Sequence, residues 1–199
     1  DVALPIWEAG AHIDIVLDAD TVRQYSLCSS PADAHEYRIA VLREADGRGG
    51  SRRICDDLKV GDTVTIRGPR NHFPLAPSKH YLFVAGGIGV TPMLPMIEAA
   101  NAAGAEWSLA YGGHTRSAMA FAGDLVDWYG SHVTLIPRDE VPDSLSKRLP
   151  ELLEHPHGGM LVYCCGPESL LSAAEDLMSH WAKGALHLER FSPKAVDGE

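Results

Sequence analysis

Glycines are concentrated at residues 85–92, where the sequence reads AGGIGVTP between a continuous apolar run and a helical pattern. Gly86, Gly87 and Gly89 carry no Cβ, so a ligand can approach the backbone closely there. The helix that follows offers free N–H groups and a partial positive charge, which suit a diphosphate. The spacing is not GxGxxG, and the alternative is a glycine-rich turn without a ligand. We favour a ligand because open α/β sheets commonly bind one at such turns.

A second turn with possible chemistry, Cys165-Gly166-Pro167, follows another apolar run. Parallel strands end at one edge of a sheet, so this turn should lie beside the first. The Cys165 thiol would then line the space beside a reacting ring. The alternative is a buried cysteine that acts as a small hydrophobic residue before an ordinary turn.

Residues 23–27 (RQYSL) alternate in character, as a strand does. Arg23 and Tyr25 share one face, and Gln24 and Ser26 share the other. The Arg–Tyr face suits a flat, charged ligand, and the Ser26 hydroxyl can hydrogen-bond a heterocycle. The alternative is a strand with a solvated arginine.

Residues 47–51 (GRGGS) combine flexible glycines, an arginine and a serine that opens a short helix. Arg48, Gly49, Gly50 and Ser51 would make a phosphate cradle; the alternative is a flexible hairpin loop. With the turn at 85–92, the chain holds two candidate phosphate cradles. Two phosphate-bearing cofactors that meet at a domain interface would explain both.

The elements that must position these motifs fall into two groups. Closely spaced alternating segments separated by turn residues favour a small antiparallel β-barrel with one short helix, at about 51–58. The predicted strands are 11–16, 22–27, 36–42 and 63–67. After residue 77 the pattern becomes a β–α alternation, which is typical of a doubly wound parallel sheet. The predicted strands there are 81–85, 107–111, 132–136, 160–164 and 185–188, and the helices 91–103, 120–129, 145–153 and 168–181.

We therefore expect an antiparallel barrel domain at residues 1–77, an α/β domain at 78–191 and a polar linker at 192–199. A net charge of −10 argues against a nucleic-acid partner. No apolar run is long enough to span a bilayer, and we expect no membrane partner and a cytoplasmic location. The four cysteines include no C-x-x-C pair, so we expect no metal or iron–sulfur site in this chain.

The motifs at 23–27, 47–51, 86–93 and 165–167, followed by Phe191, resemble in their order the ferredoxin–NADP reductase superfamily. Within it the chain is most similar to the phthalate dioxygenase reductase family, which residues 71–75 (NHFPL) and 163–167 (YCCGP) also resemble. The same module occurs in self-sufficient P450 fusions. The resemblance covers nearly the whole chain.

The resemblance implies FMN as the flavin, hydride transfer from NAD(P)H to it, and single-electron transfer onward. The implied flavin residues are Arg23, Gln24, Tyr25, Ser26, Arg48, Gly49, Gly50, Ser51, Thr91 and Phe191. The implied nucleotide residues are Gly86, Gly87, Gly89, Thr91, Cys165, Gly166 and Pro167, with Cys165, Thr91 and Ser26 nearest the reaction. The family usually carries a plant-type [2Fe-2S] domain, whose C-x4-C-x2-C spacing is absent here. The acceptors implied are therefore a ferredoxin domain or protein, and through it a Rieske or P450 oxygenase.

The nucleotide preference should depend on Thr115, Arg116 and Ser117, which follow the second α/β strand. An arginine with hydroxyls favours a ribose 2′-phosphate, whereas a carboxylate would favour the 2′-OH. The loop has no acid, which favours NADPH; a solvated Arg116 would leave NADH preferred. Two other functions stay open: a free flavin reductase with exchangeable flavin, and a non-catalytic flavin-binding partner subunit.

Overall fold

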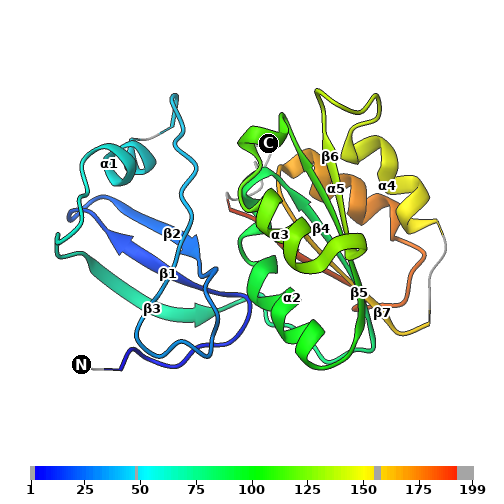
Figure 1. The fold of residues 1–199 in the computed structure, drawn as a ribbon, viewed down its shortest axis with the longest axis horizontal. Coiled ribbons are helices and arrows are strands. Elements are labelled where there is room, and N and C mark those ends of the chain that lie inside the picture. The colour runs from blue at the N-terminus through cyan, green and yellow to red at the C-terminus, as the bar shows by residue number, and fades with distance from the viewer. Residues whose placement is uncertain (1–2, 48, 155–157, 192–199) are drawn as a thin grey trace, which may run out of the picture.

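The chain is organised around two sheets, one antiparallel and one parallel, which lie side by side (Figure 1). The computed structural model describes residues 3–47, 49–154 and 158–191. The first sheet has the order β2-β1-β3 and the second the order β6-β5-β4-β7-β8. This confirms the predicted fold class, an antiparallel β unit followed by a doubly wound α/β unit. The unit expected as an antiparallel barrel has a three-stranded antiparallel sheet among the described residues. Among the described residues, no helix is long and apolar enough to cross a membrane.

The antiparallel sheet is built on β1 (Ala11–Val16), which pairs with both β2 (Val22–Ser26) and β3 (Thr65–Asn71). Alternation along β1 buries Ile13 and Ile15 in a small core with Trp7 and Leu27. The short helix α1 (Gly50–Asp56) begins after Gly49, whose φ of 82° is left-handed and suits glycine.

The predicted strand at 36–42 is wrong, because this segment forms no strand in the structure. It runs beside the end of β2 and makes one backbone bond there, from Cys28 N to Arg38 O at 2.8 Å. The amide of Arg38 donates instead to the hydroxyl of Ser29, at 3.2 Å. The Ser29 hydroxyl thus takes the place of the backbone carbonyl that would accept this hydrogen bond in a regular antiparallel pair. Residues 36–42 are therefore left without a regular partner strand.

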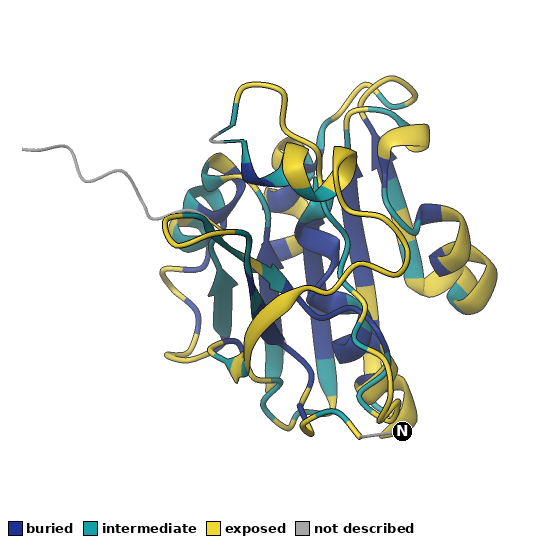
Figure 2. Ribbon diagram, turned by 90° about the vertical axis from the view of Figure 1, so that its left-hand side faces the viewer, coloured by how far each residue is buried: buried dark blue, intermediate teal, exposed yellow. Residues whose placement is uncertain are grey.

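The parallel sheet consists of β4 (His80–Gly86), β5 (Glu106–Gly113), β6 (Val133–Pro137), β7 (Met160–Cys165) and β8 (Leu186–Glu189). Its central strands are largely buried, and they are dark blue in Figure 2. One face packs against α2 (Met93–Ala102) and α3 (Ala122–Tyr129). The other packs against α4 (Leu145–Leu153) and α5 (Glu168–Leu177). Cys164 and Cys165 fall in these two different cores, as the alternation of a strand requires.

Three helices of this unit differ from their predicted bounds, and the smallest difference is in α3, which begins at Ala122 instead of residue 120. The helix expected at 91–103 is preceded by a tight 3-10 turn, η1 (Gly87–Val90), and α2 itself begins at Met93. The helix expected at 168–181 ends at Leu177, although Met178 and Trp181 stay in the core beyond it. The apolar spacing of the sequence continues past the end of the helix because the turn that follows is also packed into the core.

Tyr163 on β7 joins the connecting segment to the parallel sheet. Its hydroxyl accepts the amide hydrogen of Ala76 at 2.7 Å and donates to Pro74 O at 3.0 Å. Its ring contacts Phe73 edge-on, with centroids 5.3 Å apart. These contacts fix the path between the two sheets, and so the placement of one against the other.

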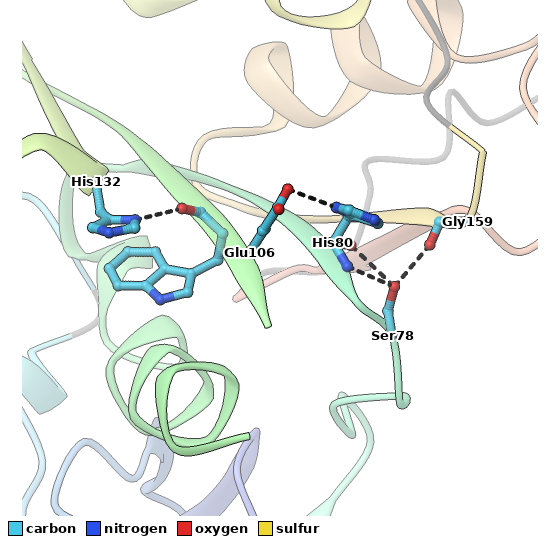
Figure 3. Close-up of polar contacts among 6 residues, drawn as sticks. Ser78, His80, Glu106, His132 and Gly159 are labelled. Atoms are coloured by element: carbon cyan, nitrogen blue, oxygen red, sulfur yellow. Dashed lines mark hydrogen bonds and ion pairs between the residues drawn. The ribbon is translucent and has the colours of Figure 1, made fainter. Parts of the chain in front are cut away.

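The amino-terminal edge of the parallel sheet is closed by side-chain hydrogen bonds (Figure 3). Ser78 Oγ donates to Gly159 O at 2.7 Å, and His80 Nδ1 lies 3.1 Å from Glu106 Oε2. His132 Nδ1 bonds Trp107 O at 2.9 Å. These contacts hold the strand starts together, and the glycine turns lie at the opposite, carboxyl-terminal edge.

Candidate active site at the carboxyl edge of the parallel sheet

A pocket lies between the two units and gathers most of the residues predicted to bind a flavin. It is lined by Arg23, Gln24, Tyr25, Ser26, Ala40, Leu42, Glu44, Gly50, Ser51, Ile88, Thr91 and Phe191. Gly49 is not among these lining residues, and Arg48 lies outside the described residues. The sequence reasoning missed Ala40, Leu42 and Glu44, because the predicted strand at 36–42 gave no indication that its end turns into a pocket. It also missed Ile88, an apolar residue between the glycines of the turn at 85–92.

Strand β2 supplies one wall of this pocket. Arg23 packs on the start of α1, where a Cβ on Gly50 would overlap its side chain. Gly50 therefore makes room for the guanidinium arm, and the hydroxyl of Ser51 belongs to a residue that lines the same pocket. That hydroxyl accepts the amide hydrogen of Glu44 at 3.1 Å. Tyr25 is half-buried, and burial raises the pKa of its phenol. A cation, a phenol ring and small polar groups thus face one space.

The two glycine-containing turns of the parallel sheet are in direct contact. A Cβ on Gly89 would overlap the carbonyl oxygen of Cys165, and would lie 2.6 Å from its carbonyl carbon and 2.9 Å from Gly166 N. A Cβ on Gly86 would lie 2.7 Å from Pro167 Cδ. Only glycine permits this close approach. The contact shows that the two turns lie together at one edge of the sheet. Thr91 is buried at the end of η1 and donates through Oγ1 to Ile88 O at 3.0 Å.

Behind the pocket, three side chains from distant parts of the chain meet. Ser26 Oγ donates to Glu189 Oε2 at 3.3 Å, and Cys165 Sγ lies 4.0 Å from the same oxygen. Burial raises the pKa of Cys165 well above its usual value and the pKa of Glu189 to about 7. The thiol therefore stays protonated at neutral pH. The Glu189 carboxyl is poised between its protonated and ionised forms.

Glu189 was missed because 163 positions separate it from Ser26. One signal was available: Cys165 and Glu189 are opposite partners in the β7–β8 register, and so lie on one face of the sheet. Arg190, the next residue, bonds Glu168 Oε2 at 3.0 Å and Glu175 Oε2 at 2.9 Å on α5. These ion pairs hold the end of β8, so that Glu189 and the pocket-lining Phe191 are presented toward the antiparallel unit.

The raised pKa of Glu189 predicts a pH dependence of stability. Between pH 4.5 and about 7 the folded chain keeps this proton, whereas the unfolded chain has lost it, so stability falls as pH rises. Glu189→Gln stays neutral throughout, and should gain up to about 3 kcal/mol in unfolding free energy relative to the parent over this window. Urea unfolding of both chains from pH 4.5 to 8 measures the difference. Parallel pH profiles for the two chains would show that the carboxyl is not held protonated.

The predicted nucleotide loop follows β5. Thr115 Oγ1 and Ser117 Oγ lie 3.1 Å apart, and Thr115 Oγ1 also accepts the amide of Ala118 at 3.2 Å. Arg116 is bound by Glu140: Nε lies 2.9 Å from Oε1, and Nη2 lies 2.6 Å from Oε2. Glu140 comes from the turn after β6 and was not anticipated, because 24 positions separate the two residues. Within the described residues, no group of three or more His, Cys, Asp or Glu side chains is placed to hold a metal ion.

The chain is similar to known proteins in both sequence and fold. Residues 5–74 match the family described as the oxidoreductase FAD-binding domain. Phthalate dioxygenase reductase of Burkholderia cepacia is 37% identical over 191 residues, which are 94% of this chain and 59% of the relative. The fold of this chain matches a solved structure of phthalate dioxygenase reductase with a TM-score of 0.87 and 36% identity. The match covers 94% of this chain and 59% of that one. The chain is thus similar to phthalate dioxygenase reductase over 94% of its own length.

Two further matches are to an oxidoreductase and to a cytochrome P450 monooxygenase. Vanillate O-demethylase oxidoreductase of Pseudomonas putida is 36% identical, over 99% of this chain and 63% of the relative. An intact type IV self-sufficient cytochrome P450 monooxygenase matches with a TM-score of 0.91 and 45% identity, over 98% of this chain and 25% of that one. The chain spans about three fifths of the length of these curated relatives. A flavin-binding fold is thus joined to a pyridine-nucleotide-reductase fold.

Proposed function

We propose that this chain is the reductase unit of an oxygenase system, and that it oxidises NAD(P)H through a bound FMN. Its electrons would pass singly to a [2Fe-2S] ferredoxin domain or protein that supplies a Rieske or P450 oxygenase. The observation that carries the proposal is the pocket between the two units, which has a cation, aromatic rings and hydroxyls on its walls. A bound flavin supplies the exchange between a two-electron donor and a one-electron acceptor.

The residues around the pocket fit a flavin. Tyr25 and Phe191 offer aromatic surfaces, and Phe191 is 49% exposed, which leaves its ring available for stacking. We assign Arg23, Gln24, Tyr25 and Ser26 to the ring and the adjoining ribityl-phosphate. Gly49, Gly50 and Ser51 are assigned to the phosphate, and Arg48 is a weaker assignment. FMN is proposed over FAD on the resemblance stated above, supported by the position of Gly50 and Ser51 in the same pocket as the ring-facing residues.

The nucleotide would bind at the carboxyl edge of the parallel sheet. We assign to it Gly86, Gly87, Gly89, Thr91, Thr115, Arg116, Ser117, Cys165, Gly166 and Pro167. Cys165, Thr91 and Ser26 would line the place where nicotinamide and flavin rings meet and would exclude water from it. Glu189 Oε2 can hold a proton next to Ser26 Oγ, which is the side chain of this cluster that lines the pocket. The division into units at 1–77 and 78–191 is part of the same proposal.

The NADPH preference expected from Arg116 remains a prediction. It depended on a loop without an acid, and the structure adds Glu140 to that loop's surroundings. For the reaction itself, the test is steady-state NAD(P)H oxidation by the FMN-loaded chain with ferricyanide as a one-electron acceptor. The proposal predicts about two ferricyanide ions reduced for each nucleotide oxidised. A chain that binds FMN but oxidises neither nucleotide would be a non-catalytic partner subunit.

Gel filtration of the FMN-loaded chain separates the proposal from a free flavin reductase. An electron-transfer unit must keep its flavin between turnovers, so FMN should elute with the protein. Flavin that is lost on the column while NAD(P)H oxidation continues with added flavin would show that the flavin is a diffusible substrate.

A further inference from the structure

Arg116 and Glu140 form a paired charge at the carboxyl edge of the parallel sheet. The guanidinium contacts both carboxylate oxygens, with Nε at 2.9 Å and 3.1 Å from them. Neither residue is fully exposed, and the side chains are 52% and 42% accessible. The pair raises the pKa of Arg116 and lowers that of Glu140, so both groups are charged at neutral pH. A two-point contact of this kind fixes the plane of the guanidinium as well as its position.

The backbone brings the two loops together. Strands β5 and β6 are parallel neighbours, and Gly113 is paired with Pro137 at their ends. Arg138 N donates to Gly113 O at 3.0 Å, and Glu140 N donates to Pro137 O at 3.1 Å. The turn that carries Glu140 is therefore anchored to the strand that leads into the Arg116 loop. The charge of Asp139 also acts on Arg116 from this turn.

This position has a consequence for nucleotide recognition. In doubly wound sheets the adenosine ribose binds near the end of the second strand, where an arginine accommodates a 2′-phosphate and a carboxylate accepts the 2′-OH. Here both kinds of group are present and bound to each other. A 2′-phosphate that bound Arg116 would have to displace Glu140 or lie beside its negative charge. A ribose 2′-OH meets no such opposition.

We propose that Glu140 is a specificity-determining residue, whose carboxylate opposes NADPH relative to NADH by occupying Arg116. The inference rests on the proposed function, because it assumes that the adenosine end of NAD(P)H binds beside Arg116. Glu140 acts on the preference between nucleotides and not on the reaction of the rings.

The test measures binding without any electron transfer. Calorimetric titration with 2′,5′-ADP and with 5′-AMP, at low ionic strength where exposed charges are least screened, reports the affinity for the 2′-phosphate alone. Glu140→Gln should tighten 2′,5′-ADP binding by about tenfold and change 5′-AMP binding by less than about twofold. In the FMN-loaded chain, the same substitution should raise the ratio of kcat/KM for NADPH to that for NADH by a similar factor.

Two controls define the mechanism. Asp143→Asn removes one negative charge farther along the same segment, where Asp143 pairs with Lys147 at 3.7 Å, and it should leave the selectivity unchanged. In the double variant Glu140→Gln with Arg116→Gln the gain should vanish, because it acts through Arg116. A gain that persists without Arg116, or that Asp143→Asn reproduces, would overturn the inference.

The outcome is separable from that of the proposed function. If the FMN-loaded chain oxidised neither nucleotide but Glu140→Gln still tightened 2′,5′-ADP selectively, the reductase proposal would fail and the role of Glu140 would stand. If NAD(P)H oxidation proceeded but Glu140→Gln left the binding of both adenosine fragments unchanged, the role of Glu140 would be refuted and the reductase proposal would stand.

Discussion

Replacing Arg23 by glutamine is expected to weaken FMN binding by about 100-fold, because hydrogen bonds to charged groups contribute roughly 1.5–3 kcal/mol. Arg23 lines the same pocket as Ser51, and its side chain packs directly on the start of α1 at Gly50. It is thus placed where a phosphate held by Gly50 and Ser51 would need a counter-charge. Titration of the flavin-free chain with FMN, followed by quenching of flavin fluorescence, measures the change.

Arg38→Gln is the matched control for this substitution. Arg38 belongs to the same antiparallel unit and is not among the pocket-lining residues; its guanidinium pairs with Glu36 on the surface at 2.8 Å. The control should bind FMN as the parent does. Equal FMN affinities for the Arg23→Gln, Arg38→Gln and parent chains would place the phosphate away from Arg23 and remove the main support for the assigned orientation.

Gly89→Ala should destabilise the α/β unit by about 3 kcal/mol, at the upper end of the usual cost of overpacking. The added methyl group would overlap the carbonyl group of Cys165, which is backbone and cannot swing away as a flexible side chain would. Either η1 or the end of β7 must move, and both carry residues assigned to the nucleotide. We expect a fall in the thermal midpoint together with a loss of NAD(P)H binding.

Gly123→Ala provides the comparison for this prediction. Gly123 lies within α3, and a Cβ there would meet nothing within 4 Å. Alanine has the higher helix propensity, so this variant should be as stable as the parent or slightly more stable. A Gly89→Ala chain with an unchanged thermal midpoint would mean that the two turns are farther apart than the structure places them.

Local patterns in the sequence predicted much of this site. The apolar spacing of Leu145, Leu149 and Leu153 gave the bounds of α4 as the structure has them, because an amphipathic helix is recorded in a single stretch of sequence. The alternation along β2 placed Arg23, Gln24, Tyr25 and Ser26 correctly at one strand, and all four line the pocket. The glycines at 86–89 predict room for a ligand beside the backbone, and the structure shows that Gly89 also makes room for the carbonyl group of Cys165.

Two of the residues that sequence reasoning missed, Glu189 and Glu140, depend on long-range pairing. Glu189 meets Ser26 only because the two units pack together, and Glu140 meets Arg116 only because β5 and β6 are neighbours. The predicted strand at 36–42 is the opposite case, because the local pattern is present but the long-range pairing is not. Its alternation is typical of a strand, yet strand formation requires a partner with free backbone groups, and Ser29 supplies a side-chain acceptor instead.

The central claim is that the pocket between the two units brings a flavin to a bound nicotinamide, and an anaerobic single-turnover titration tests it most directly. The FMN-loaded chain is mixed with one equivalent of NADH or NADPH while flavin absorbance is followed at about 450 nm. We predict bleaching of the flavin band with at least one nucleotide, complete at close to one equivalent. A chain that holds FMN tightly in this pocket, yet keeps its full absorbance with excess NADH and excess NADPH, would contradict the claim.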